Sequence, residues 1–149
     1  MHLLVKLINK DAKPLARNPD DPAAVGYDIF SPMDVVVDPL QRRLIKCGFK
    51  TEFTEGYMGQ INDRSGMGNK GMTVFGGVID PSYRGEWGVI LYNSTGAPFE
   101  IKRGDKIAQV VFVKVGLPDV VVVEGELSES NRGEKGFGSS DKTGATHNL

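Results

Sequence analysis

Cysteine is almost absent from the chain, and long apolar runs are absent altogether. The single cysteine, Cys47, excludes an internal disulfide framework and a cysteine-based zinc cluster, and it suits a reducing compartment. The apolar stretch 1–10 is too short and too interrupted for a signal peptide, and no run approaches the ~18 residues that a membrane span needs. The sequence therefore predicts a soluble, cytoplasmic protein without a membrane partner.

Charge of one sign is also missing. Lys and Arg number 18 and Asp and Glu number 19, which gives a formal net charge of −1. This balance argues against a polybasic nucleic-acid binder and against an acidic tail protein. Amphipathic helices are scarce as well. The one short candidate is Gly59–Gly71, and its four glycines argue against a helix there.

Glycine and short β-branched runs are what the chain has in abundance. Its 149 residues are enough for one domain with a core, and 19 of them are glycine, against about 7% in an average protein. Short apolar runs separated by turn-forming residues predict an all-β sandwich or barrel. The expected strands are Leu3–Ile8, Asp34–Val37, Arg43–Phe49, Met72–Phe75, Trp87–Tyr92, Ile107–Val115 and Val120–Val123.

The composition changes near Glu124, beyond which half of the residues are Gly, Ser, Thr or Asn. We therefore expect a β domain over residues 1–123 and a mobile C-terminal arm over residues 124–149. Phe137 has only glycine neighbours and no local core to join, so we expect it to bind a ligand. Together with Arg132 and the hydroxyls of Ser139 and Ser140, it suits a nucleotide, over which the arm would order as a lid.

The segment Asp63-Arg64-Ser65-Gly66 combines a guanidinium fork, a hydroxyl and flexible backbone N–H groups, which suits a phosphate. The alternative is a surface ion pair between Arg64 and Asp63, and the segment alone favours that alternative. The pattern G-x-G-x-x-G over Gly66–Gly71 is not a dinucleotide fingerprint, because a strand and not a helix follows it.

A hairpin is expected over residues 76–86, with Asp80 at the end of an apolar strand. A carboxylate in that place can act as a general base, and the paired glycines Gly76 and Gly77 let a ligand approach the backbone. Tyr83 can present its ring to the same pocket. The alternative is an ordinary hairpin in which Asp80 accepts hydrogen bonds from turn amides.

Gln109 is a polar residue inside the apolar run Ile107–Val115. Strand alternation places it on one face with Ile107 and Val111. It is therefore either buried with hydrogen-bond partners or directed toward a ligand.

Taken together, five ordered segments resemble the five motifs of the trimeric deoxyuridine triphosphatase (dUTPase) family, over about residues 3–140. The segments are Ala24–Ile29, Arg64–Gly66, Gly77–Glu86, Gly104–Gln109, and Arg132-Gly133 with Gly136–Ser140.

The resemblance implies a jelly-roll-like β fold and a homotrimer whose active sites are shared between subunits. It also implies Mg²⁺-assisted hydrolysis of dUTP to dUMP and pyrophosphate, which limits uracil in DNA and supplies dUMP for dTMP synthesis, in the host cytoplasm if the protein is viral. Asp80 would orient and deprotonate the water that attacks the α-phosphorus, Tyr83 would pack against the deoxyribose, and Asp28 would support the phosphate and metal region. Mg²⁺ would be held mainly by the triphosphate and water, so no dedicated protein metal ligands are expected.

The resemblance also implies which residues bind substrate. The hairpin backbone would read uracil, a second group would hold phosphates, and the arm would close over the γ end with its ring on the base. These residues are, in that order, Gly77, Val78 and Ile79; Arg64, Ser65, Gly66 and Gln109; and Arg132, Phe137, Gly138, Ser139 and Ser140. Lys135, Asp141 and Phe75 depart from the usual family pattern, which bears on the strength of the lid and on affinity.

Three alternatives stay open beside this interpretation. A dCTP deaminase shares the fold, but its proton-transferring Glu falls at Ile90 here, and an Ile cannot move protons. A dUTP-sensing module with a regulatory protein partner is a second alternative, although no residue indicates the partner. A jelly-roll structural subunit explains the strands but not Arg132 and Phe137 on a Gly/Ser-rich arm.

Overall fold

The computed structural model describes residues 1–136. Contacts within the chain divide it into two compact units, Met1–Leu117 and the residues from Pro118 onward. Among the described residues, all strands and the one helix belong to the first unit. Within residues 1–136 no helix has both the length and the apolar character to cross a membrane. The predicted division into a domain over 1–123 and an arm over 124–149 stays a prediction.

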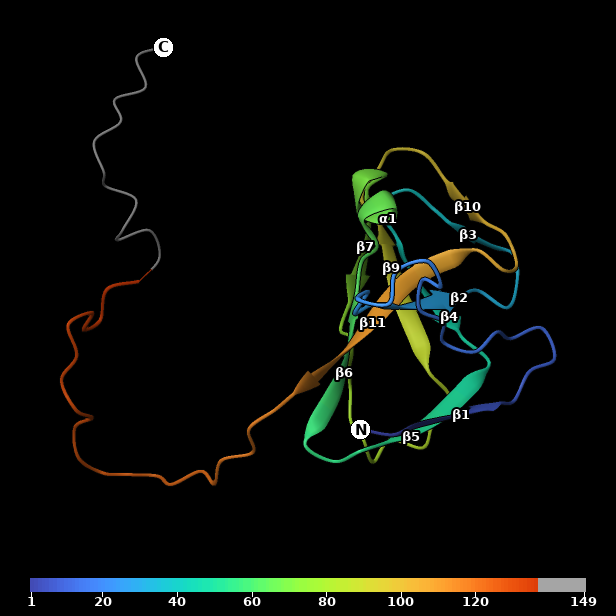
Figure 1. Ribbon diagram of the computed structural model, residues 1–149. Coiled ribbons are helices and arrows are strands. Elements are labelled where there is room, and N and C mark those ends of the chain that lie inside the picture. The colour runs from blue at the N-terminus through green and yellow to red at the C-terminus, as the bar shows by residue number, and fades with distance from the viewer. Residues whose placement is uncertain (137–149) are drawn as a thin grey trace, which may run out of the picture. The chain divides into compact units, whose positions relative to one another are not determined.

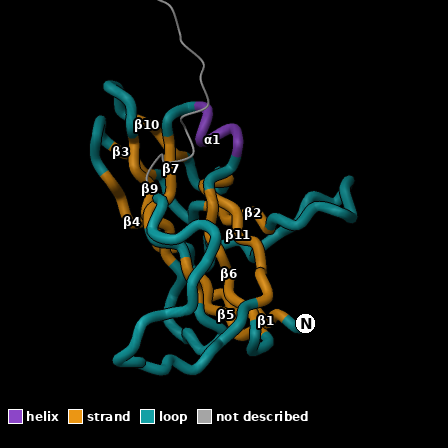
Figure 2. Tube along the Cα trace, turned by 90° about the vertical axis from the view of Figure 1, so that its left-hand side faces the viewer, coloured by secondary structure: helices purple, strands orange, loops and turns teal. Residues whose placement is uncertain are grey.

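The first unit is built from antiparallel strands, which confirms the predicted all-β fold. A four-stranded sheet has the order β2-β11-β6-β8 and a three-stranded sheet the order β4-β9-β7; β1 pairs with β5, and β3 with β10. In Figures 1 and 2, helix α1 and the β3–β10 pair lie at one end of this unit, and the β1–β5 pair lies at the other. The elements are β1 (Leu3–Leu7), β2 (Tyr27–Phe30), β3 (Val35–Val37), β4 (Arg42–Lys46), β5 (Phe49–Phe53), β6 (Tyr57–Asn62), α1 (Ser65–Asn69), β7 (Met72–Phe75), β8 (Val78–Ile79), β9 (Gly88–Asn93), β10 (Phe99–Ile101) and β11 (Lys106–Lys114).

Five predicted strands match β1, β3, β7, β9 and β11 to within one residue at each end. The predicted strand Arg43–Phe49 is wrong as a single element, because the chain turns at Gly48, whose φ of 74° separates β4 from β5. The predicted strand Val120–Val123 is also wrong: these valines belong to no strand and are 56–90% exposed. High β propensity alone does not form a strand, and among residues 1–136 no neighbouring strand pairs with these valines.

Trp87 is the largest fully buried side chain in the core of the first unit. Its ring lies 5.3 Å from that of Phe49, and its indole Nε1 donates to Thr51 Oγ1 at 3.0 Å. Asn93 is also fully buried, and its amide nitrogen donates to Val37 O at 3.0 Å. These bonds satisfy polar groups that would otherwise be costly to bury.

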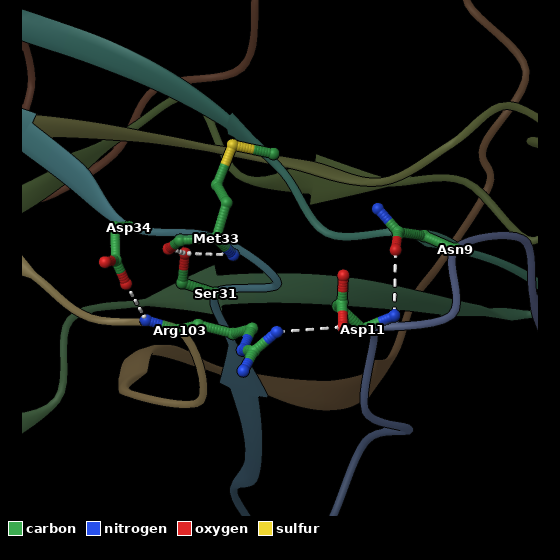
Figure 3. Close-up of polar contacts among 6 residues, drawn as sticks. All are labelled: Asn9, Asp11, Ser31, Met33, Asp34 and Arg103. Atoms are coloured by element: carbon green, nitrogen blue, oxygen red, sulfur yellow. Dashed lines mark hydrogen bonds and ion pairs between the residues drawn. The ribbon is translucent and has the colours of Figure 1, made fainter.

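A set of turn contacts fixes the start of β11 against the end of β2. Ser31 N donates to Asp105 O at 2.9 Å, and Gly104 N donates to Ser31 O at 2.7 Å. Figure 3 shows the side chains that surround this turn: Arg103 N donates to Asp34 Oδ1 at 2.8 Å, and Arg103 Nη1 donates to Asp11 Oδ1 at 3.1 Å. The two strands therefore enter the site in a defined register.

That register contains a β-bulge in β11. Lys106 lies opposite Phe30 and Gln109 lies opposite Asp28, so the stretch 106–109 of β11 faces the shorter stretch 28–30 of β2. A bulge of this kind breaks the strict alternation of faces. It changes which residues of β11 reach the same surface, and this determines the composition of the site.

Candidate active site

A pocket of about 460 Å³ opens where β2, β11 and the start of α1 meet. It carries one acidic and two basic side chains, from Asp28, Arg64 and Lys106. Its other lining residues come from the first, second and fourth predicted motifs and from the loop before β2. The full lining is Asn18, Ala24, Val25, Gly26, Asp28, Arg64, Ser65, Gly66, Lys106 and Gln109.

The charged centre of the pocket is the carboxylate of Asp28, whose side chain is only 16% exposed. Its Oδ1 accepts from Arg64 Nε at 2.9 Å, and its Oδ2 lies 2.7 Å from Lys106 Nζ. The alternative in which Arg64 pairs with Asp63 is therefore wrong. One carboxylate between two cations leaves a net positive pocket, which suits an anion.

Asp63 has a different task, which is to tie the end of β6 to β7. Its carboxylate accepts from Val74 N at 2.6 Å and from Thr73 Oγ1 at 3.1 Å. Its backbone carbonyl accepts from Gln109 Nε2 at 2.8 Å. Because Asp63 immediately precedes Arg64, these bonds fix the backbone from which the arginine extends.

Gln109 is half-buried, has a hydrogen-bond partner and also lines the pocket. Its contact with a ligand stays a prediction. Its Oε1 occupies the space where a side chain at Gly26 would start, so a larger residue there would require the Gln109 side chain to shift. The face predicted for Gln109 is partly wrong. Ile107 is fully buried in the core and not beside Gln109, because the bulge interrupts the alternation.

Ser65 and Gly66 line the pocket as the first residues of α1. The first N–H groups of a helix have no acceptor within it, so those of this segment are available to a ligand. The four glycines of residues 59–71 argued against a helix there, but a short one is present over Ser65–Asn69.

The hairpin glycines lie against β6. Gly77 O accepts from Ile61 N at 2.7 Å, and β8 continues the contact by pairing Val78 with Gln60 and Ile79 with Gly59. Gly77 has a φ of 110°, and a Cβ there would lie 2.7 Å from Ile61 O. Only glycine can therefore bring this backbone so close to β6. Val78 is 63% exposed, which leaves this edge of the sheet accessible to a ligand.

Asp80 and Tyr83 lie in the turn that follows β8. Tyr83 N donates to the backbone carbonyl of Asp80 at 3.1 Å, and the Tyr83 hydroxyl donates to Glu86 O at 3.2 Å. Asp80 is exposed and Tyr83 is 42% exposed. In the part of the chain that the structure describes, neither residue lines the pocket of Asp28 and Arg64. The predicted site residues of the first unit thus fall into two places. One is the pocket around Asp28 and Arg64, which we call the phosphate-type pocket after the residues expected to bind phosphate, and the other is the hairpin.

The predicted arm residues are only partly described. Arg132 lies in a local turn in which its Nε donates to Lys135 O at 2.8 Å. Phe137, Gly138, Ser139 and Ser140 lie outside the described residues, as does Asp141. Their roles stay predictions.

Lys106, like Asn18, lines the pocket but was not predicted from the sequence as a site residue. Strict alternation along β11 separates positions 106 and 109 onto opposite faces. The bulge brings both into one pocket, where Lys106 contacts Asp28. Its neighbours in the fourth motif carry no signal for a bulge, so sequence reasoning had no means to find it.

The chain is similar to a family of known proteins. The model of the family described as dUTPase matches residues 14–141. The deoxyuridine 5'-triphosphate nucleotidohydrolases of vaccinia virus (strain Copenhagen) and variola virus are each 38% identical over 136 residues, covering 91% of this chain and 90% of theirs.

Solved structures of two phage proteins are similar as well. The dUTPase of Staphylococcus bacteriophage 80alpha with dUpNHpp has a TM-score of 0.86 and 33% identity, covering 93% of this chain and 98% of its own. A mutant dUTPase of phage phi11 of S. aureus, with a structural Mg(II) ion, has a TM-score of 0.78 and 28% identity, covering 86% and 100%.

Proposed function

The chain belongs to the dUTPase family, and from this premise we propose that it hydrolyses dUTP to dUMP and pyrophosphate. The observation that carries the proposal is the pocket in which Arg64, Ser65, Gly66 and Gln109 meet around the Asp28 carboxylate. These four residues are the ones that the sequence assigns to phosphate binding. They come from two separate segments of the chain, and Asp28 comes from a third.

Phosphate binding follows from the donors in the pocket. Arg64 uses Nε toward Asp28, so its two terminal nitrogens remain for a bidentate contact with phosphate oxygens. The Ser65 hydroxyl and the N–H groups at the start of α1 add donors that need no rearrangement to receive an anion. Phosphoryl transfer depends mainly on such positioning and charge stabilisation.

The hairpin supplies the catalytic and selective groups. Asp80 orients the attacking water and accepts its proton as that water approaches the α-phosphorus. An aspartate with a reference pKa near ~3.9 is a weak base, so its main contribution is to align the water in line with the leaving pyrophosphate. The Tyr83 ring packs against the deoxyribose and leaves no room for a ribose 2′-hydroxyl. The backbone of Gly77, Val78 and Ile79 reads the uracil edge.

The donor set fits a Mg²⁺ ion that arrives with the triphosphate. Among residues 1–136, no three His, Cys, Asp or Glu side chains are grouped as metal ligands, and both Asp28 oxygens already face cations. Mg²⁺ commonly keeps several waters and binds substrate phosphates with few protein ligands. When bound, the ion neutralises charge on the triphosphate. Arg64, Ser65 and Gln109 would surround the phosphates that carry it.

We further propose a homotrimer in which two subunits complete each site. The separation of Asp80 and Tyr83 from the phosphate-type pocket supports this, because hydrolysis needs both groups on one substrate. The hairpin of one subunit would then lie over the pocket of its neighbour. Arg132, Phe137, Gly138, Ser139 and Ser140 would close over the triphosphate and the base.

Mixing two inactive variants tests the shared site. Asp80→Asn removes the proposed general base from the hairpin, and Arg64→Ala removes the guanidinium from the pocket. Each homotrimer should therefore be inactive. After unfolding and refolding together in equal amounts, each mixed trimer regains one intact site, and about a quarter of the wild-type activity should return. The control is the double variant Asp80→Asn, Arg64→Ala, unfolded and refolded alone, which should stay inactive. No recovery in the mixture, with trimers formed, would place the whole site within one subunit.

The remaining predictions belong with this proposal. The alternative of a deaminase is disfavoured by Ile90, which lies on β9 where proton transfer would need a carboxyl group. Limiting uracil in DNA, supplying dUMP and acting in the cytoplasm (the host's, if the chain is viral) are the physiological expectations. Neither a nucleic acid nor a regulatory protein is proposed as a partner.

A further inference from the structure

Lys106 and Arg64 share the carboxylate of Asp28 in an unequal way. Arg64 approaches Oδ1 through Nε alone, at 2.9 Å, while Lys106 Nζ takes Oδ2 at 2.7 Å. Among the described residues, no other hydrogen bond of the Arg64 side chain is present. The two terminal nitrogens of its guanidinium are therefore uncommitted within residues 1–136.

A guanidinium and a carboxylate prefer a different geometry when nothing intervenes. Two parallel N–H···O bonds form, one to each carboxylate oxygen, and the pair becomes bidentate. Here the second oxygen is already occupied by an ammonium group. Its charge is compact, and its 2.7 Å contact is the shorter of the two.

We propose that Lys106 is a positioning residue for substrate binding, which keeps the guanidinium fork of Arg64 free for phosphate by occupying the second oxygen of Asp28. The inference rests on the proposed function, since it assigns a task within the same site. It differs from direct phosphate binding because Lys106 acts through Asp28. It follows from the bulge in β11, which places Lys106 beside Gln109 in the pocket.

The pocket geometry favours this task over that of an ordinary surface ion pair. The Asp28 side chain is 16% exposed, so the carboxylate that the two cations share is largely desolvated. The nearby pair of Lys102 and Glu100 is 3.8 Å apart, with side chains 65% and 70% exposed. Exposed pairs of that kind contribute little, whereas a partly buried carboxylate determines where its cations lie. Lys102 therefore offers a matched control.

The test compares full-length protein with Lys106→Met, Lys106→Arg and the control Lys102→Met, each in the wild-type and Asp28→Asn backgrounds. Steady-state hydrolysis of dUTP gives KM and kcat. Calorimetric binding of inorganic tripolyphosphate gives the affinity of the pocket independently of hydrolysis. Thermal unfolding midpoints verify that each variant is folded.

With Asp28 present, Lys106→Met should weaken tripolyphosphate binding and raise KM about 10-fold, the loss of one charge-assisted hydrogen bond, with kcat changed less than about 2-fold. Lys106→Arg should restore both values because it also fills Oδ2. In the Asp28→Asn background the same Met substitution should change affinity less than about 2-fold, because no carboxylate remains to capture Arg64.

Three results would overturn the proposal. Equal losses in both backgrounds would mean that Lys106 contacts phosphate directly. Unchanged affinity with a lowered unfolding midpoint would leave Lys106 a purely structural role. Failure of Lys106→Arg to restore affinity would exclude occupancy of Oδ2 as the cause. Absence of dUTP hydrolysis by the wild type would instead refute the proposed function, while tripolyphosphate binding still reports on Lys106.

Discussion

Gly77 and Gly76 offer a matched pair of substitutions that measures how closely the hairpin is held against β6. Gly76 has a φ of 75°, and a Cβ there would meet nothing within 4 Å. Gly77 has a φ of 110°, and its Cβ would lie 2.7 Å from Ile61 O, closer than real Cβ atoms approach a backbone oxygen. The same backbone also accepts the 2.7 Å hydrogen bond from Ile61 N, so it cannot move away without weakening that bond.

The two alanine variants should therefore differ in stability. Gly76→Ala carries only left-handed strain and should lower the free energy of unfolding by about 1 kcal/mol. Gly77→Ala adds an overlap with backbone to a less favourable φ, and should lower it by about 3 kcal/mol. Because Gly77 leads into Val78 and Ile79, the proposed uracil reader, its variant should also raise KM for dUTP more than Gly76→Ala does.

Urea unfolding at one fixed protein concentration measures both losses, since the stability of an oligomer depends on that concentration. Gly76→Ala serves as the control for the general effect of losing glycine. Equal losses for the two variants, or a smaller loss for Gly77→Ala, would refute the argument that contact with Ile61 requires glycine.

Three further predictions concern the hairpin, the arm and the core. Asp80→Asn should lower kcat by about 10³-fold, because it removes the proposed general base. KM should change little, because Asp80 does not line the phosphate-type pocket. Pyrophosphate release measures both constants, and a large rise in KM with an unchanged kcat would contradict the proposed role. Removing residues 124–149 should lower kcat/KM for dUTP about 100-fold while the circular dichroism spectrum of the β domain persists, and full activity of the shortened chain would exclude the lid. Burial raises the pKa of the Cys47 thiol from 9.0 to about 12, so the folded state keeps a proton that the unfolded chain loses as the pH rises. The free energy of unfolding should thus fall above about pH 9 by up to ~1.4 kcal/mol per pH unit. Urea unfolding at several pH values should give a shallower dependence on pH for Cys47→Ala. An equal dependence in the two proteins would contradict the prediction.

Strand positions were predictable where apolar runs were uninterrupted. The strands β7, β9 and β11 are read directly from β-branched runs between turn formers. The strands β2, β6 and β10 were missed because each is short or carries polar residues that local pattern does not distinguish from loop. Val120–Val123 shows the reverse error: four valines have strong β propensity, but pairing requires a neighbouring strand.

Most of the residues that meet in the pocket were named from the sequence, but the contacts between them were not. Arg64 and Gln109 could be assigned to phosphate from their types and the family resemblance. Their partners could not, because Asp28 is 36 positions from Arg64 along the chain and the pairing depends on the fold. The position of Lys106 in the pocket could not be predicted, because it depends on a bulge that shifts the register by one residue. The role of Asp63 could not be predicted either, because it depends on hydrogen bonds to β7.

The most direct test of the proposed dUTP hydrolysis is pyrophosphate release from the purified protein with Mg²⁺, compared for dUTP, dTTP, dCTP and UTP. We expect release from dUTP alone, because we propose that the hairpin backbone reads uracil and that Tyr83 excludes a ribose 2′-hydroxyl. Comparable release from UTP or dTTP, or none from dUTP, would contradict it.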